Sequence, residues 1–476
     1  MDGFEEIKKL LEDCNQSHIL KYWDELSVEQ QKEFLKQLNN LDIKGACEMW
    51  ERLQERDKYD KIDENDVIPV ETEVERNCSH DVIIAYRNIG LEEISKGTVA
   101  VIVLAGGQGT RLGMSYPKGM CSTGIPSGKT LFQLQAERIK RLQELAKEKS
   151  GTEGIIHWYI MTSEATDIIT DKFIQQSQYF NLNKNNVRLF KQSQVPCFDL
   201  EGKFILEEKD GIAMAPDGNG GIYKALKQNG ILDEMDKKGI KYVFVHSVDN
   251  ILIKVADPVF IGKAVKDKAD CALKVIKKTD PKEPLGVVIR SNGTPKVVEY
   301  SEILQAGKLE QASGDGLVFN SGNICIHLFT VTFLKTISNE YEQDLKLHEA
   351  KKIITQIGPE GDKIRPTQPN CIKIEKFIFD VLPYSKNFMA WQVERSEEFS
   401  PVKNSDLCKK DCFTSAKADL LMLHKKWVEN NGGICKGVEI EISPLVSYGG
   451  EGLDFIKGKE FKETEIILAK SEQTQI

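Results

Sequence analysis

The apolar residues in the first part of the chain recur with the period of an α-helix. They are spaced three and four residues apart in segments 7–11 and 20–26, which places them along one side of a helix. Ser27 is followed three residues later by Gln30, the pattern of a capping box at a helix start. The pattern predicts a helical N-terminal region over residues 1–95, which contains no candidate chemistry.

From residue 99 onward, the apolar residues form short continuous runs instead. The first run, Val99–Leu104, is rich in β-branched residues and predicts a strand that is buried on both faces. A helix with a capping box at Thr130 follows. Further runs of the same kind occupy segments 155–161, 187–190, 242–248 and 272–276. This alternation predicts an α/β domain with a mostly parallel sheet over residues 96–395.

The pattern changes again near residue 396. One helix over 415–427 ends at a strong stop signal, Asn430-Asn431-Gly432-Gly433, and a strand-like run follows at 438–442. We therefore expect a small C-terminal domain over residues 396–476.

Composition and charge narrow the choice of function. The chain has 476 residues, and 64 Lys and Arg against 73 Asp and Glu give a net charge of −9, which argues against nucleic acid as a partner. We expect no signal peptide and no membrane span, because the longest apolar stretches fall short of about 18 residues. The eleven cysteines are scattered, as in reduced cytoplasmic proteins. No motif predicts an oligomeric state.

A glycine-rich loop after the first predicted strand carries most of the candidate chemistry. Gly106, Gly107 and Gly109 are spaced closely enough for backbone N–H groups to converge on an anion, at the strand end where open α/β sheets bind ligands. Arg111 and Lys118 add two positive charges seven residues apart. Converging amides and cations are what a nucleoside triphosphate needs as pyrophosphate departs.

Three other interpretations fit this loop less well. The spacing Gly107-x-Gly109-x-x-Leu112 lacks the third glycine of a dinucleotide fingerprint, and Lys118 is misplaced for a Walker A loop. A tight structural turn would explain the glycines, but not the Arg and the Pro-Lys pair that follow them.

The same loop resembles a known family. Leu104-Ala-Gly-Gly-x-Gly-Thr-Arg-Leu-Gly followed by Pro-Lys is similar to the signature of sugar-nucleotide pyrophosphorylases, and its end, Lys118-Gly119-Met120, resembles the eukaryotic UDP-N-acetylhexosamine pyrophosphorylases. Five further segments resemble motifs of that family in the same order: Met214-Ala215-Pro216-Asp217-Gly218-Asn219-Gly220-Gly221, Val248-Asp249-Asn250, Val298-Glu299-Tyr300-Ser301-Glu302, Phe319-Asn320-x-Gly322-Asn323 and Ser400-Pro401-x-Lys403-Asn404. The resemblance covers nearly the whole chain.

This resemblance implies both a fold and a reaction. The fold is α/β, a Rossmann-like nucleotidyltransferase core flanked by the helical N-terminal region and the C-terminal domain. The reaction joins UTP to N-acetylglucosamine 1-phosphate, and also to N-acetylgalactosamine 1-phosphate, giving the UDP-N-acetylhexosamine and pyrophosphate. The sugar phosphate attacks the α-phosphorus in line, with Mg²⁺ as cofactor and Mn²⁺ as its substitute.

The resemblance also implies roles for individual residues. Arg111 and Lys118 are the catalytic candidates. The nucleotide-binding candidates are Leu104, Ala105, Gly106, Gly107, Lys118, Gln192, Gly218, Asp249, Lys373 and Lys403. The sugar-binding candidates are Asn219, Glu299, Tyr300 and Asn323.

Chemistry supports some of these roles independently. The amide of Gln192 can pair with a uracil edge, whereas without the resemblance a solvated loop residue is the commoner interpretation. Asp249 ends a predicted strand, where a carboxylate can hold Mg²⁺ against phosphate oxygens or instead cap a helix. Asp380 is a weaker second metal candidate with the same capping alternative. Cys121 lies near two cations that would lower the pKa of its thiol, unless the thiol is buried and inert.

Two competing functions remain. Glucose-specific enzymes usually carry Asn before the glycine pair and no Arg after Gly-Thr, so Ala105 and Arg111 favour an N-acetylhexosamine substrate. A catalytically silent sugar-nucleotide sensor would keep the fold without the chemistry. The presence of Arg111, Lys118 and Asp249 favours an enzyme.

Overall fold

The computed structural model describes residues 3–55, 66–299, 302, 312–313 and 316–473. The chain forms two compact units. Unit 1 comprises residues 1–63, 192–225 and 341–381, and unit 2 comprises residues 64–191, 226–340 and 382–476.

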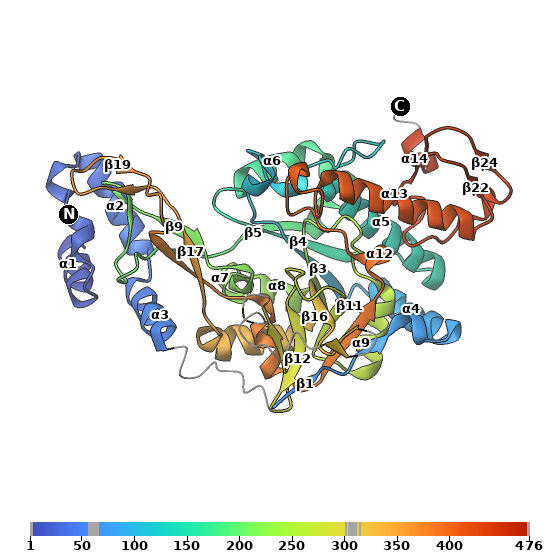
Figure 1. Ribbon diagram of the computed structural model, residues 1–476, viewed down its shortest axis with the longest axis horizontal. Helices are drawn as coiled ribbons and strands as arrows, with labels where there is room; N and C mark the ends of the chain where they lie inside the picture. The colour runs from blue at the N-terminus through green and yellow to red at the C-terminus, as the bar shows by residue number, and fades with distance from the viewer. Residues whose placement is uncertain (1–2, 56–65, 300–301, 303–311, 314–315, 474–476) are drawn as a thin grey trace. The chain divides into compact units, whose positions relative to one another are not determined.

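Unit 2 is built on a large mixed sheet (Figure 1). Its strands run in the order β2-β21-β11-β16-β10-β3-β4-β5, and β16 alone on this path is antiparallel to its neighbours. Their bounds are β2 Glu73–Val74, β3 Val99–Leu104, β4 Ile156–Thr162, β5 Val187–Lys191, β10 Tyr242–Ser247, β11 Cys271–Lys277, β16 Ser321–Thr330 and β21 Phe388–Val393. The α/β class and the mostly parallel sheet are therefore confirmed.

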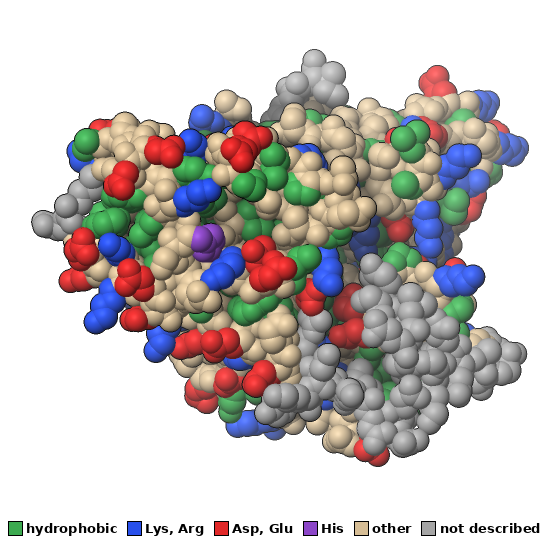
Figure 2. Space-filling model, turned by 60° about the vertical axis from the view of Figure 1, so that its left-hand side comes forward, with side chains coloured by type: hydrophobic (Ala, Val, Ile, Leu, Met, Phe, Trp, Pro, Cys, Tyr) green, Lys and Arg blue, Asp and Glu red, His purple; other side chains and the backbone are tan. Residues whose placement is uncertain are grey.

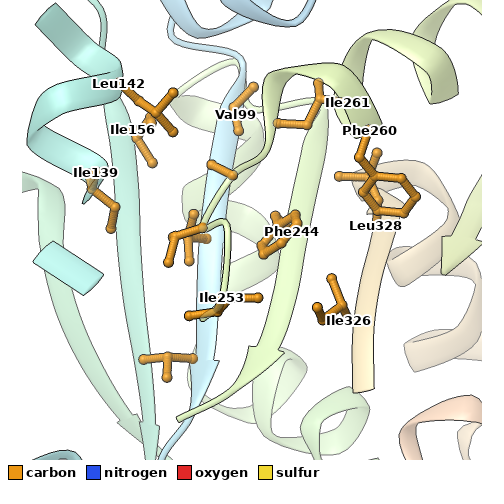
Figure 3. Close-up of a cluster of buried hydrophobic side chains, with 14 of the residues drawn as sticks. Val99, Ile139, Leu142, Ile156, Phe244, Ile253, Phe260, Ile261, Ile326 and Leu328 are labelled. Carbon is orange, nitrogen blue, oxygen red and sulfur yellow. The ribbon is translucent and has the colours of Figure 1, made fainter. Parts of the chain in front are cut away.

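Helices cover the sheet because its central strands are apolar on both faces. Every residue of β3 is buried. On one face, α5 (Leu131–Ser150) and α9 (Pro258–Asp267) contribute to a continuous apolar core. Figure 3 shows Ile139 and Leu142 of α5, and Phe260 and Ile261 of α9, lying against side chains of the strands. On the opposite face, the Tyr159 hydroxyl of β4 donates to Glu234 of α8 (Ile231–Lys237) at 3.0 Å.

The C-terminal segment belongs to unit 2. Its long helix α13 (Phe413–Asn430) packs its apolar residues against those of α5. Lys129, just before α5, has its Nζ 2.6 Å from both Glu137 and Glu472 and 3.0 Å from Ser443. Since Lys129 is 7% exposed, these bonds fix the segment from inside the unit.

Unit 1 has a separate apolar core. Helices α1 (Phe4–Asp13), α2 (Val28–Asn40) and α3 (Ile43–Glu55) pack against residues of two strand-containing segments. The strand pairs are β6 (Gln194–Pro196) with β9 (Met214–Pro216), β7 (Leu206–Glu208) with β8 (Gly211–Ile212), β17 (His348–Lys352) with β20 (Cys371–Glu375), and β18 (Gln356–Ile357) with β19 (Lys363–Ile364). The capping box at Ser27 is present as expected.

The two units differ from the three consecutive segments, 1–95, 96–395 and 396–476, expected from the sequence. The reason is burial. The apolar faces of the N-terminal helices are covered by Phe198, Phe204, Ile212, Ile372 and Ile374, which come from the middle of the chain. The pattern along the chain marks the helices but not their distant partners.

Both charge signs occur together on the surface that Figure 2 shows. On the face shown in Figure 2, Lys and Arg side chains are interspersed with Asp, Glu and apolar side chains. Across the described part of the chain, no helix combines the length and the apolar character needed to cross a bilayer.

Candidate active site

The glycine-rich loop starts at the carboxyl edge of the unit 2 sheet. The Ala105 N–H donates to Met161 O at 2.8 Å, and Leu104 O accepts the Val248 N–H at 3.2 Å. The Gly106 carbonyl accepts the Ser163 hydroxyl at 2.8 Å. The neighbouring strands therefore fix the start of the loop, while Gly107 is exposed.

Lys118 and Asp249 meet beside this loop. Lys118 Nζ lies 3.3 Å from Asp249 Oδ2 and donates to Val402 O at 3.2 Å. The Ser247 hydroxyl donates to Asp249 Oδ1 at 2.9 Å. The side chains of Lys118 and Asp249 are 19% and 13% exposed, so both are partly accessible to a ligand. The structure thus brings together two candidates that are 131 residues apart in the sequence.

The Asp249 carboxylate fits a magnesium ion. Mg²⁺ uses hard oxygen ligands, commonly one or two carboxylates together with substrate phosphates and water. Asp249 offers such oxygens at the end of β10, and the Ser247 hydroxyl orients one of them. Lys118 Nζ, 3.3 Å from Asp249 Oδ2, places a positive charge beside this carboxylate.

A second group of carboxylates in unit 2 does not fit a metal. Among the described residues, Glu75, Asp257 and Glu398 lie close enough to share an ion. However, Lys274 Nζ lies 2.6 Å from Asp257 and also pairs with Glu398, and Lys254 lies 3.4 Å from Glu398. Unlike the partly accessible Lys118 and Asp249, the side chains of Lys274, Asp257 and Glu398 are 0%, 4% and 1% exposed. Lys274 therefore neutralises these carboxylates in the interior, and the group is a buried ion-pair cluster.

The other cationic candidates of unit 2 are less constrained. Arg111 lies in the short helix η5 (Thr110–Leu112) and is exposed, with no ion pair to any residue that the structure describes. Lys403 is anchored through its backbone N–H, which donates to Asp411 O at 2.7 Å, and its Nζ lies 5.7 Å from the Phe399 ring centroid.

Two sugar-binding candidates lie next to each other in unit 2. The Asn323 N–H donates to Gly286 O at 2.9 Å. A Cβ on Gly286 would lie 3.0 Å from Glu299 Oε1. Glu299 and Asn323 therefore flank the same glycine, whereas Tyr300 lies outside the described residues.

The remaining nucleotide and sugar candidates lie in unit 1. Gln192 follows β5, Gly218 and Asn219 lie in a loop between β9 and α7 (Ile222–Gln228), and Lys373 lies on β20. The loop that contains Gly218 and Asn219 lies very close to the backbone of Lys376. A Cβ on Gly218 would lie 2.4 Å from Lys376 O, and one on Gly220 would lie 2.6 Å from Lys376 C. Only glycine fits these two positions.

Asp380 makes contacts typical of a capping residue. Its Oδ2 accepts the Phe377 N–H at 2.8 Å and lies 3.0 Å from His348 Nε2. Its side chain is 6% exposed. Of the two roles expected from the sequence, second metal ligand or cap, the structure shows the contacts of the cap.

Two residues of unit 1 escaped the sequence analysis. Asp217 is 5% exposed, and its Oδ1 has no hydrogen-bond partner within the described ranges. Burial raises the pKa of its carboxyl to about 7, although Lys376 and Lys224 oppose the shift. His348 was also missed, since a lone His carries no motif. The Asp-Gly-Asn-Gly-Gly motif contains Asp217 but does not indicate its burial.

Cys121 has the environment of an inert thiol. It is 3% exposed, and burial raises the pKa of the thiol to about 11. Its Sγ donates to Ser122 O at 3.4 Å. The cations nearby in sequence therefore do not activate it.

Comparisons with known proteins give a consistent result. The model of the family described as UTP–glucose-1-phosphate uridylyltransferase matches residues 47–449. The chain is 42% identical to the UDP-N-acetylhexosamine pyrophosphorylase-like protein 1 of Xenopus tropicalis, over 99% of this chain and 98% of the relative. It is 40% identical to the UDP-N-acetylglucosamine pyrophosphorylase of Saccharomyces cerevisiae, over 97% and 99% of the two chains.

A solved structure shares the fold. The crystal structure of the uridine diphosphate N-acetylglucosamine pyrophosphorylase from Trypanosoma brucei, in complex with an inhibitor, superposes with a TM-score of 0.84. The two chains are 29% identical, and the match covers 99% of each.

Proposed function

The chain belongs to the UTP–glucose-1-phosphate uridylyltransferase family and, within it, to the UDP-N-acetylhexosamine pyrophosphorylases, and from this premise we propose its substrates. It converts UTP and N-acetylglucosamine 1-phosphate to UDP-N-acetylglucosamine and pyrophosphate, and it also accepts N-acetylgalactosamine 1-phosphate. Relatives named for N-acetylated sugars, together with Ala105 and Arg111 in the loop, support this choice over glucose. We also propose that it works in the cytoplasm.

The observation that carries the proposal is the pairing of Lys118 with Asp249 at the carboxyl edge of the sheet. Both side chains are partly accessible beside the glycine-rich loop. A polyphosphate substrate with a bound metal ion would suit them, because a carboxylate can bind the metal and a cation can bind the phosphates. The carboxylate would hold Mg²⁺, or Mn²⁺ in its place, and the ion when bound neutralises charge on the triphosphate.

The reaction requires only positioning and charge neutralisation. A phosphate oxygen of the sugar 1-phosphate attacks the α-phosphorus of UTP, forming one phosphoanhydride bond. The bond between the α-phosphorus and its bridging oxygen to the β-phosphorus breaks, and pyrophosphate leaves with the electron pair. Lys118 and Arg111 stabilise the negative charge that develops on the leaving group. No covalent intermediate with the enzyme forms.

Other roles follow from the family. We assign backbone contacts with the nucleotide to Leu104, Ala105, Gly106 and Gly107, and contacts with the phosphates to Lys373 and Lys403. We assign uracil recognition to Gln192 and Gly218. Recognition of the sugar is assigned to Asn219, Glu299, Tyr300 and Asn323.

The deciding experiment measures pyrophosphate release from UTP and Mg²⁺ with three sugar 1-phosphates in turn. We expect release with N-acetylglucosamine 1-phosphate to be well above that with glucose 1-phosphate, and the N-acetylgalactosamine rate measures the breadth of specificity. A preference for glucose would overturn the proposed substrate. Binding of UDP-N-acetylglucosamine without any release would identify a sensor instead.

A further inference from the structure

The loop 217–221 of unit 1 is shaped by a short stretch of neighbouring backbone. The Lys376 N–H donates to Asp217 O at 2.8 Å, and Lys376 O accepts the Gly220 N–H at 2.8 Å. Two residues further on, the Ile378 N–H donates to Asn219 Oδ1 at 3.0 Å. Residues 376–378, which we call the support segment, therefore contact the loop at three points.

These contacts fix the loop closely. Gly218 and Gly220 lie very close to the support segment: a Cβ on Gly218 would overlap backbone atoms of residue 376, and one on Gly220 would overlap those of residues 376 and 377. Any displacement of the support segment must therefore displace the loop. Because Asn219 Oδ1 accepts from Ile378, the orientation of the Asn219 amide depends on the same segment.

Asp380 fixes the support segment from its other side. Its Oδ2 accepts the Phe377 N–H at 2.8 Å, and its own N–H donates to Phe377 O at 3.0 Å. The Asp380 carboxylate thus binds the backbone N–H of Phe377, the central residue of the support segment, and this N–H makes no bond to the loop 217–221.

His348, on β17, fixes Asp380 in turn. His348 Nε2 lies 3.0 Å from Asp380 Oδ2 and 3.2 Å from Oδ1, so the ring donates to the carboxylate. The same ring stacks on Phe377 with centroids 4.1 Å apart and an interplanar angle of 28°. One side chain therefore contacts both the capping carboxylate and the support segment, and it is itself only 12% exposed.

We propose that His348 and Asp380 are a positioning pair, which holds the support segment and thereby keeps the loop 217–221 in the shape that binds uridine and sugar. Asp380 acts through the backbone and is not a ligand of the metal. This inference rests on the proposed function, which assigns uracil and sugar recognition to Gly218 and Asn219.

The first test measures binding of UDP-N-acetylglucosamine in the presence of a chelator, so that no metal contributes. We expect Asp380→Ala and His348→Leu each to raise Kd about tenfold or more, because small displacements of binding groups are costly. His348→Gln restores a donor near the position of Nε2 and should recover most of the affinity. The half-saturating Mg²⁺ concentration for turnover should stay at the wild-type value in all three variants.

Asp270 provides the matched control. Its carboxylate also caps a turn, accepting the Ser385 hydroxyl at 2.5 Å and the Lys386 N–H at 2.9 Å. It lies in unit 2, and its hydrogen bonds within the described ranges go to residues 330 and 385–387, none of which is a candidate. Asp270→Ala should leave Kd unchanged. Wild-type affinity in Asp380→Ala would overturn the proposal, and so would a raised Mg²⁺ requirement in that variant.

A second measurement separates this inference from the proposed function. Hydrogen–deuterium exchange of peptides covering 217–221, in the absence of ligand, should be faster in Asp380→Ala and His348→Leu than in wild type or Asp270→Ala. Wild type that binds no UDP-sugar would refute the proposed function, while the exchange rates still decide whether the pair holds the loop. Unchanged exchange would refute the pair even in a fully active enzyme.

Discussion

The two glycine-rich loops of this protein illustrate two ways of building a binding surface. The loop in unit 2 is followed by cations, and Arg111 and Lys118 are both accessible. The loop 217–221 in unit 1 has no cation of its own and is instead held to residues 376–378 by two backbone hydrogen bonds and one to the Asn219 side chain. Charge dominates the first loop and shape dominates the second, so substitutions in the two should affect different kinetic constants.

The largest effect is expected from Lys118. Lys118→Ala removes a cation that pairs with Asp249, and loss of one preorganised charge at a transition state costs roughly 10²–10³-fold in kcat. Arg111→Ala should behave similarly. Steady-state rates of pyrophosphate release, with KM for UTP measured separately, check the prediction. Near-normal kcat in either variant would remove that residue from the catalytic assignment.

A single added methyl group in the loop 217–221 should weaken substrate binding. Gly220→Ala would place a Cβ 2.6 Å from Lys376 C, so loop or support segment must shift. We expect KM or Kd for uridine nucleotides to rise by about 10–100-fold, with a smaller fall in kcat. Gly211→Ala is a fitting control in the same unit, because the nearest atom to its Cβ would be Glu208 Cβ at 3.6 Å. Equal kinetics for the two variants would contradict the tight approach seen here.

The buried Asp217 of the loop 217–221 should make the stability of the protein depend on pH. Burial raises the pKa of its carboxyl from 3.8 to about 7, so the folded state holds a proton that the unfolded state releases. Stability contributed by this group is therefore present below pH 3.8 and is lost as the pH rises toward 7, by at most roughly 4 kcal/mol.

Asp217→Asn tests this directly, since an amide stays neutral. Urea denaturation should show the variant gaining stability over wild type at pH 8, with little difference at pH 4. The groups that face Asp217 are Lys376, Lys224 and Glu342, and their charges are unchanged by the substitution. A variant less stable than wild type at pH 8 would show that the charged carboxylate makes a favourable contact.

The same contrast explains what could be predicted from the sequence. The strand Val99–Leu104 and the helix after Thr130 were predicted correctly, because local apolar period and capping chemistry determine them. The sequence placed the glycine-rich loop and Asp249 each after a predicted strand, and both strands are present, but the contact of Lys118 with Asp249 was not predicted. Motifs that act through charged side chains are visible in a sequence.

The parts that escaped prediction depend on distant backbone contacts. Nothing local indicates that His348 meets Asp380, or that residues 376–378 support a loop more than 150 residues earlier in the chain. The division into units was missed for the same reason, since Phe198 and Ile372 cover helices from the N-terminus. Such partners are set by the packing of the whole unit and leave no periodic signal.

The smallest effect on activity is expected from substitution of Cys121. This residue tests whether the cations of the glycine-rich loop in unit 2 alter the pKa of a nearby thiol. If nearby cations governed this thiol, they would lower its pKa and make it reactive at neutral pH. Burial acts in the opposite direction and raises the pKa to about 11, so the thiolate is scarce. Iodoacetamide at pH 7.5 should therefore modify the exposed Cys408 and leave Cys121 unmodified in the native enzyme, as peptide mass spectrometry can measure.

Cys121→Ala should keep kcat within about twofold of wild type, because the thiol touches no reacting group. Labelling of Cys121 that UTP prevents would instead show that the cations of the loop outweigh burial at this position.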